Sequence, residues 1–186
     1  MNPLSDTARL FLNSLLNQNM TLVYFLGILF IMVEAKSIKK TSIKGLKYIV
    51  IILIVNILGW YFASVIFPGY VALRPAIFFI TTILGITILL KWDELQGEWL
   101  GLPYYILFIG PLYGSQWLIS SAGHDYSQMI TVSSGYIIGF YILFVLSASM
   151  KEQILVSDAT PLFKRYSTLL AALGMLALGI IGFHLF

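Results

Sequence analysis

Four polar residues stand inside or at the end of long apolar runs of this 186-residue chain, where they could carry ion chemistry. Asn56 interrupts one run, Ser115 and Gln116 interrupt another, and Glu34 ends a third beside Lys36. Side-chain oxygens and free carbonyls in such places can coordinate a cation that crosses a membrane. We therefore name these four residues as a possible ion route. Interhelical hydrogen bonding is the plainer role for Asn56, and an interface charge is the plainer role for Glu34.

Other chemistry is limited by what the chain lacks. It has no cysteine, so it can offer neither a disulfide nor a thiolate ligand to a metal. Its two histidines, His124 and His184, are isolated, which predicts no metal site. It also has no phosphate-binding glycine motif, no nucleophile elbow and no zinc-protease motif. We expect no catalysis by this chain alone, whether or not it belongs to an enzyme.

The composition predicts a membrane protein. Hydrophobic residues make up 59% of the chain and charged residues 10%, far from the balance of a soluble domain. We expect one integral membrane domain over residues 1–186, made of helices because the apolar runs are too long and continuous for barrel strands. Six runs approach the length of a transmembrane helix: Leu10–Val33, Tyr48–Phe67, Pro75–Leu90, Trp99–Ser120, Met129–Ala148 and Ser167–Phe186.

The basic residues between these runs predict an orientation. Nine of the eleven lie in the first, third and fifth loops, and only Arg9 and Arg74 lie on the other side. The positive-inside rule places the odd loops in the cytoplasm and both termini outside. Because these charges set the orientation of the chain in the membrane, we expect no nucleic acid among its partners. We expect the lipid bilayer to surround it.

Three spans in each half, entering from opposite sides, predict two inverted repeats at about residues 8–92 and 97–186. In each half, the first span is the one whose apolar run is interrupted. These two spans contain the similar tripeptides Phe25-Leu26-Gly27 and Phe108-Ile109-Gly110. We expect both spans to be broken near the membrane midplane, although proline and glycine are also common in ordinary membrane helices. The interrupting residues are Asn13, Asn17, Gln18 and Asn19 in the first, and Pro103, Gly110, Pro111, Gly114, Ser115 and Gln116 in the fourth.

The amino-acid sequence around these breaks resembles that of a family of small six-span subunits in the Rnf and Nqr ion-translocating electron-transfer complexes. The similar stretches are Asn17 to Gly27, Leu73-Arg74-Pro75, Pro111-Leu112, Lys151-Glu152 and Asp158 to Phe163. The resemblance extends from about Leu10 to Gly182 and is to the RnfA (RsxA)/NqrE branch, which shares the outward N-terminus.

The resemblance implies a subunit of the bacterial or archaeal cytoplasmic (inner) membrane that packs against an inverted homologue, RnfE/NqrD. In the family, each of the two partners supplies cysteines from its broken helices to an intramembrane iron–sulfur cluster, and the complex couples electron transfer to sodium or proton movement. Flavins and further iron–sulfur clusters are expected in the other redox subunits.

The chain departs from this pattern at the cysteine positions. Leu29 and Trp117 match them in our alignment, and neither can ligate iron. We therefore expect this chain to bind no cofactor alone, with Leu29 and Trp117 occupying the space where the cluster would lie. Trp117 could stack on a replacement carrier.

Two other functions remain open at this point. One is a small-molecule uptake component, such as the substrate-binding membrane subunit of a vitamin transporter, which has a similar span count and length. The other is a structural partner that has lost electron transfer. Tight vitamin binding by the isolated chain would indicate the first, and copurification with an inverted homologue would indicate an Rnf/Nqr-like complex.

Overall fold

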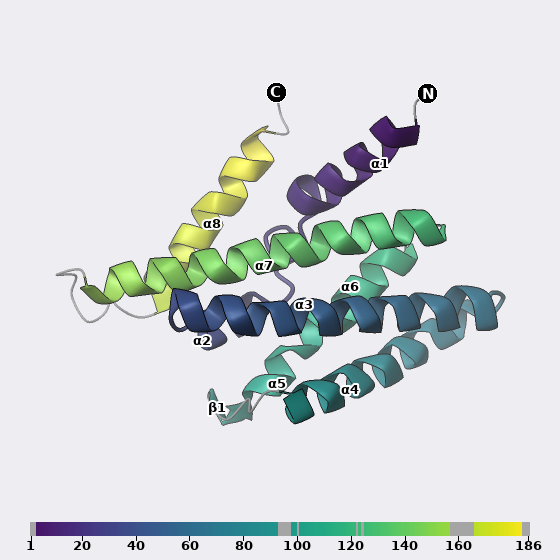
Figure 1. Ribbon diagram of the computed structural model, residues 1–186, viewed down its shortest axis with the longest axis horizontal. Helices are drawn as coiled ribbons and strands as arrows, with labels where there is room; N and C mark the ends of the chain where they lie inside the picture. The colour runs from purple at the N-terminus through teal and green to yellow at the C-terminus, as the bar shows by residue number, and fades with distance from the viewer. Residues whose placement is uncertain are drawn as a thin grey trace.

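The computed structural model describes residues 3–92, 98–99, 101–121, 123, 125–156 and 166–183. These residues are mostly helical, which confirms the all-helical prediction, apart from one pair of two-residue strands (Figure 1). The helices are α1 (Pro3–Leu12), α2 (Ile28–Glu34), α3 (Ile38–Tyr61), α4 (Arg74–Trp92), α5 (Tyr104–Leu107), α6 (Ile109–Ser121), α7 (Tyr126–Val156) and α8 (Tyr166–Phe183). Shorter helical pieces are η1 (Asn13–Asn17), η2 (Phe62–Ile66) and η3 (Val71–Leu73), and strand β1 (Glu98–Trp99) pairs antiparallel with β2 (Leu102–Pro103).

Among the described residues, three helical stretches are long and apolar enough to cross a membrane: Ile38–Ile66, Val71–Trp92 and Tyr126–Ile154. Helix α8 contains a shorter apolar stretch, Thr168–Gly179. These stretches support a membrane protein of several passes. The count of six spans stays a prediction, because the first and fourth expected spans are made of shorter helices.

The start of α3 differs from the expectation. The helix begins at Ile38, ten residues before the expected Tyr48, so Lys39, Lys40 and the next two lysines of the first expected loop are helical. Lysine is a good helix former, and Lys39 and Lys40 are exposed at the helix start, where the charge remains solvated. The basic cluster therefore lies on the first turns of a long helix, and placing it in a loop was wrong. Residues 157–165, which include Lys164, Arg165 and the stretch from Asp158, lie outside the described residues.

Helix α3 is the centre of the packing. It lies beside α7 along most of its length and also packs against α4 and α6 (Figure 1). Helices α1 and α8 contact α7 and extend from it on the side away from α3. The long helices thus form a frame against which the shorter pieces of the two irregular spans are held.

Buried aromatic rings join the shorter pieces to this frame. Phe30 of α2 lies 4.7 Å from Phe108 and 5.2 Å from Tyr48 of α3, measured between ring centroids. Phe140 and Phe144 of α7 complete the cluster, and all five side chains are fully buried or nearly so. Tilted and edge-on ring pairs of this kind stabilise a core beyond their buried area.

Candidate functional site

The first irregular span is interrupted between Asn17 and Ile28, and buried Asn19 organises the interruption. Its Nδ2 donates to the carbonyl of Leu15 at 2.8 Å, and its Oδ1 accepts the N–H groups of Thr21 and Leu22 at 3.0 and 3.1 Å. A broken helix leaves such backbone groups without partners, which is costly away from water. Asn19 therefore does locally what the missing helical turns would have done.

Helix α7 has room for this interruption because Gly135 and Gly139 face it. A methyl group added at Gly135 would overlap Ser14 Oγ, and one added at Gly139 would overlap the Asn19 amide. Two glycines four residues apart let helices approach closely in membranes. This Gly-x-x-x-Gly spacing is visible in the sequence. It could have predicted the close contact of α7 with the first irregular span, but this motif was overlooked.

Left-handed backbone at Phe25 and Gly27, with φ angles of 56° and 82°, ends the interruption and starts α2. Glycine adopts this conformation without a steric penalty, whereas Phe25 is strained in it. A Cβ added at Gly27 would lie 3.0 Å from Pro111 Cγ and 3.2 Å from the Phe140 ring. Gly27 thus supplies both the turn and a close contact.

The second irregular span is interrupted at Phe108, between α5 and α6. The α6 ladder resumes where the Leu112 N–H donates to the Phe108 carbonyl at 3.3 Å, so Pro111 sits in the first turn. Proline removes no hydrogen bond there, because the first N–H groups of a helix have no partner inside it. The interruption was expected to extend to Gln116. That part was wrong, since Gly114, Ser115 and Gln116 lie inside continuous α6.

The two interruptions touch each other. Pro111 packs on Gly27, a Cβ added at Gly110 would lie 3.4 Å from the Gly27 backbone nitrogen, and Leu26 fills the space left by Gly114. Glycines in or beside each break thus leave room for the backbone or side chains of the other.

Behind this contact, six side chains from four helices form a set that we call the buried amide cluster. Asn56 Nδ2 donates to Ser133 Oγ at 2.9 Å, and Ser115 Oγ donates to Asn56 Oδ1 at 2.7 Å. Gln116 accepts from Thr81 Oγ1 at 2.6 Å and donates to Thr82 Oγ1 at 3.1 Å and to the Leu112 carbonyl at 3.0 Å. The members are Asn56 (α3), Thr81 and Thr82 (α4), Ser115 and Gln116 (α6) and Ser133 (α7), and all are buried.

The cluster brings together three of the four residues named for an ion route, Asn56, Ser115 and Gln116. Each amide already has a donor and an acceptor partner, so the network is closed within the protein. A closed network in a medium of low dielectric constant fixes the relative positions of the helices that carry it. Ser133 was not foreseen, because the adjacent serines Ser133 and Ser134 give no sign in the sequence of which one has a partner on another helix.

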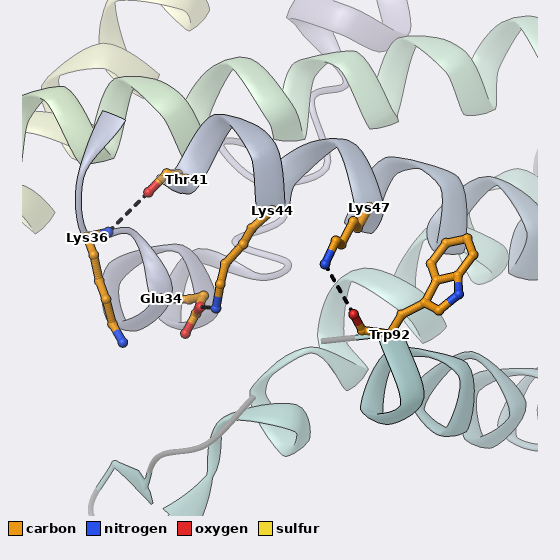
Figure 2. A network of polar contacts seen from close by, with 6 residues as sticks. All are labelled: Glu34, Lys36, Thr41, Lys44, Lys47 and Trp92. Atoms are coloured by element: carbon orange, nitrogen blue, oxygen red, sulfur yellow. Dashed lines mark hydrogen bonds and ion pairs between the residues drawn. The ribbon is translucent and has the colours of Figure 1, made fainter. Parts of the chain in front are cut away.

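Glu34, the fourth residue, lies elsewhere, at the end of α2. Its side chain is 2% exposed, and its Oε1 lies 2.6 Å from Lys44 Nζ of α3 (Figure 2). The same view shows Thr41 Oγ1 accepting the Lys36 N–H, and Lys47 donating to the Trp92 carbonyl. Removing one partner of a buried pair leaves an uncompensated charge, so Glu34 and Lys44 depend on each other.

Two neighbouring residues of α7 cap the short helix and the next one. Lys151 Nζ donates to the carbonyls of Met32 and Ala35, the latter at 2.7 Å, where α2 ends. Glu152 Oε1 accepts the Ile38 N–H at 3.0 Å, where α3 begins. A cation at a helix C-terminus and an anion at a helix N-terminus both interact favourably with the helix dipole. In the sequence, Lys151-Glu152 stood out only through the family resemblance. Their hydrogen-bond partners lie more than a hundred residues earlier in the chain.

Leu29 and Trp117, the positions that match the family's cysteines, lie on the surface of the chain. Leu29 is 46% exposed and Trp117 is 48% exposed. The Trp117 ring meets the Phe78 ring edge-on at 6.3 Å. Both side chains are thus half-exposed, and the expectation that they occupy the space where the cluster would lie stays a prediction.

An iron–sulfur cluster does not fit the groups that this chain offers. Cluster iron takes thiolate or, in some centres, imidazole ligands, and Leu29 and Trp117 have neither. Among the described residues, no group of three histidine, cysteine or acidic side chains is placed to hold a metal ion.

No family model matches the chain. The chain is similar to the RnfA subunit of the ion-translocating oxidoreductase complex of Yersinia pestis (strain Pestoides F), with 26% identity over 185 residues that cover 94% of each chain. The expected resemblance to the RnfA branch of the Rnf/Nqr family is thereby confirmed over nearly the whole chain.

Proposed function

We propose that the chain is a membrane subunit of an Rnf/Nqr-like ion-translocating oxidoreductase complex. The contact between the two helix interruptions carries the proposal, because it joins two stretches that bear the family resemblance, around Gly27 and Pro111. The full-length relative is named as a subunit of such a complex, which supports the same assignment. The chain then acts as a scaffold for an electron and ion route and does no chemistry alone.

The proposed architecture has six spans in two inverted repeats, about residues 8–92 and 97–186, within one domain. The element order supports it, because an interrupted span followed by α3 and α4 is matched by an interrupted span followed by α7 and α8. The charge distribution supports termini on the outer side of a bacterial or archaeal cytoplasmic membrane.

The proposed partner is an inverted homologue of the RnfE/NqrD type, seated over the exposed faces of α2 and α6. Half-exposed Leu29 and Trp117 support this placement, since positions that would hold a cluster shared between two subunits must face the other subunit. The partner or another subunit would have to supply all thiolate ligands, because this chain has none. Flavins and iron–sulfur clusters would belong to other subunits.

An ion route through Ser115, Gln116, Asn56 and Glu34 is a second proposal. The closed buried amide cluster favours positioning of α6 for the first three, because a cation would have to displace a hydrogen bond from each. Asn56→Ala decides between the roles: an altered dependence of activity on the coupling ion would support the route, and reduced stability alone would support positioning.

Affinity purification of the tagged chain from its native membrane tests the assignment. We expect a cysteine-bearing inverted homologue and flavin-bearing subunits to copurify, in a ratio fixed by the complex. A chain that purifies alone in a stable fold and binds a vitamin tightly would contradict the proposal and support the uptake function. Electron paramagnetic resonance, with and without the partner's cysteines, would show whether electron transfer is retained or lost.

A further inference from the structure

Two adjoining cavities lie between the start of α4 and the end of α6, away from the contact of the two breaks. The larger has a volume of about 460 Å³ and is bordered by Arg74, Asp125 and polar side chains such as Ser64. The smaller, of about 120 Å³, is bordered by Val71, Phe78 and Trp117. Both are also lined by Arg74, Ser120 and Ser121, so we treat the larger as the polar part and the smaller as the apolar part of one candidate site.

The polar part holds two opposite charges that are not paired with each other. Arg74 Nε is buried and has no hydrogen-bond partner among the described residues. No ion pair joins Arg74 to Asp125 among the described residues, although both side chains line the cavity. A buried guanidinium N–H without a partner is costly, so the cavity favours a ligand that brings an anion to Arg74. A cationic group on the same ligand would suit Asp125.

The apolar part lies one helical turn from the polar part, at Phe78 on α4 and Trp117 on α6. Helices α4 and α6 run antiparallel here, since Phe78 meets Trp117 and the next turn of α4 meets Gln116. The Phe78 and Trp117 rings stand perpendicular to each other, and both line the small apolar cavity beside Arg74. The membrane-capable stretch begins at Val71, so Arg74 sits at the end of an apolar helix, where lipid head groups lie.

We propose that this space binds one phospholipid with a zwitterionic head group. Its phosphate accepts hydrogen bonds from the Arg74 guanidinium, its ammonium group meets the Asp125 carboxylate, and one acyl chain lies against Phe78 and Trp117. The guanidinium fork matches phosphate oxygens, and the aromatic walls match a hydrocarbon chain. The inference does not depend on the electron-transfer assignment.

Native mass spectrometry of the chain, purified in mild detergent with its copurifying subunits, tests the proposal. We expect one added phosphatidylethanolamine to remain bound per chain. Arg74→Gln should weaken retention of phosphatidylethanolamine and of phosphatidylglycerol about tenfold, as loss of a charge-assisted contact does. Asp125→Asn should weaken only phosphatidylethanolamine, because phosphatidylglycerol has no ammonium group.

Arg9→Gln is the matched control, because Arg9 is an exposed arginine that lines a different cavity and should leave lipid retention unchanged. Arg74→Lys keeps the charge without the fork and should give intermediate retention, which covers the case in which Arg74→Gln fails to fold. Equal retention by the wild type, Arg74→Lys and Arg74→Gln would overturn the proposal. Inorganic phosphate that displaces the lipid at concentrations where it binds alone would overturn it as well, in favour of a free anion.

Discussion

Gln116 and Gly59 show how closely a single residue position is constrained in the buried amide cluster. A methyl group added at Gly59 would overlap Gln116 Oε1, the atom that accepts the Thr81 hydrogen bond. Gly59→Ala should therefore lower the free energy of unfolding by about 1–3 kcal/mol, the usual effect of overpacking. Denaturant titration in detergent micelles measures the change.

Gly174→Ala is the matched control for that prediction. Gly174 also lies in an apolar helix, but a methyl group added there meets no atom of the described residues within 4 Å. The substitution should leave stability unchanged or raise it by up to about 1 kcal/mol, because alanine favours the helix. In a Gln116→Ala background, Gly59→Ala should have a smaller effect. An unchanged effect there would show that Gln116 is not the neighbour that matters.

At this scale the sequence identified residues but not their partners. Asn56, Ser115 and Gln116 stood out because a polar residue in an apolar run must find a partner, and the structure brings them into one cluster. Glu34 also stood out for its charge, yet it belongs to a separate ion pair. Partners such as Ser133 and Lys151 depend on helix packing, which the local pattern does not encode.

Asn19 stabilises the first interruption as an element, because it bonds backbone groups on both sides of the missing turns. Asn19→Ala should lower the free energy of unfolding by about 2 kcal/mol, comparable to the loss of a strong helix cap. Amide hydrogen exchange of residues 20–26 should become faster. Asn17→Ala is the control, since among the described residues Asn17 Nδ2 donates only to the Asn13 side chain. Equal effects of the two variants would contradict the role given to Asn19.

Lys151 should hold the end of α2 against α7. Lys151→Met removes the donor to the Met32 and Ala35 carbonyls, so α2 should open more often and its amides should exchange faster. Lys47→Met is the comparison, because Lys47 donates to the exposed carbonyl end of α4 and not to α2. If both variants leave α2 equally protected, Lys151 is not a cap.

The sequence predicted the elements better in long regular runs than at their ends. Helix α4 matches its expected span within two residues at each end, because an uninterrupted apolar run decides it. The start of α3 was missed because lysines were assigned to a loop for topological reasons, although they are good helix formers. The second break was misplaced because a proline in the first turn of a helix starts it and does not interrupt it.

For the whole molecule, the basic first turns of α3 and the loop before α7 should lie on opposite sides of the membrane. The chain has no cysteine, so single cysteines at exposed Lys40 and Asp125 can be labelled one at a time. An impermeant thiol reagent added to intact cells should label the Asp125 position and not the Lys40 position. The reverse pattern would overturn the orientation and its agreement with the RnfA/NqrE branch.

The central claim is that the faces of α2 and α6 near the two breaks are covered by an inverted homologous subunit. Leu29 is the cleaner probe of this face, because Trp117 also borders the proposed lipid site. A photoactivatable benzoylphenylalanine at Leu29, irradiated in native membranes, should give one cross-linked product that mass spectrometry identifies as a cysteine-bearing inverted homologue. The same group at Leu178, which is 71% exposed on α8, serves as the control and should not give that product. Cross-linking of Leu29 only to lipid, in membranes that contain the homologue, would contradict the account.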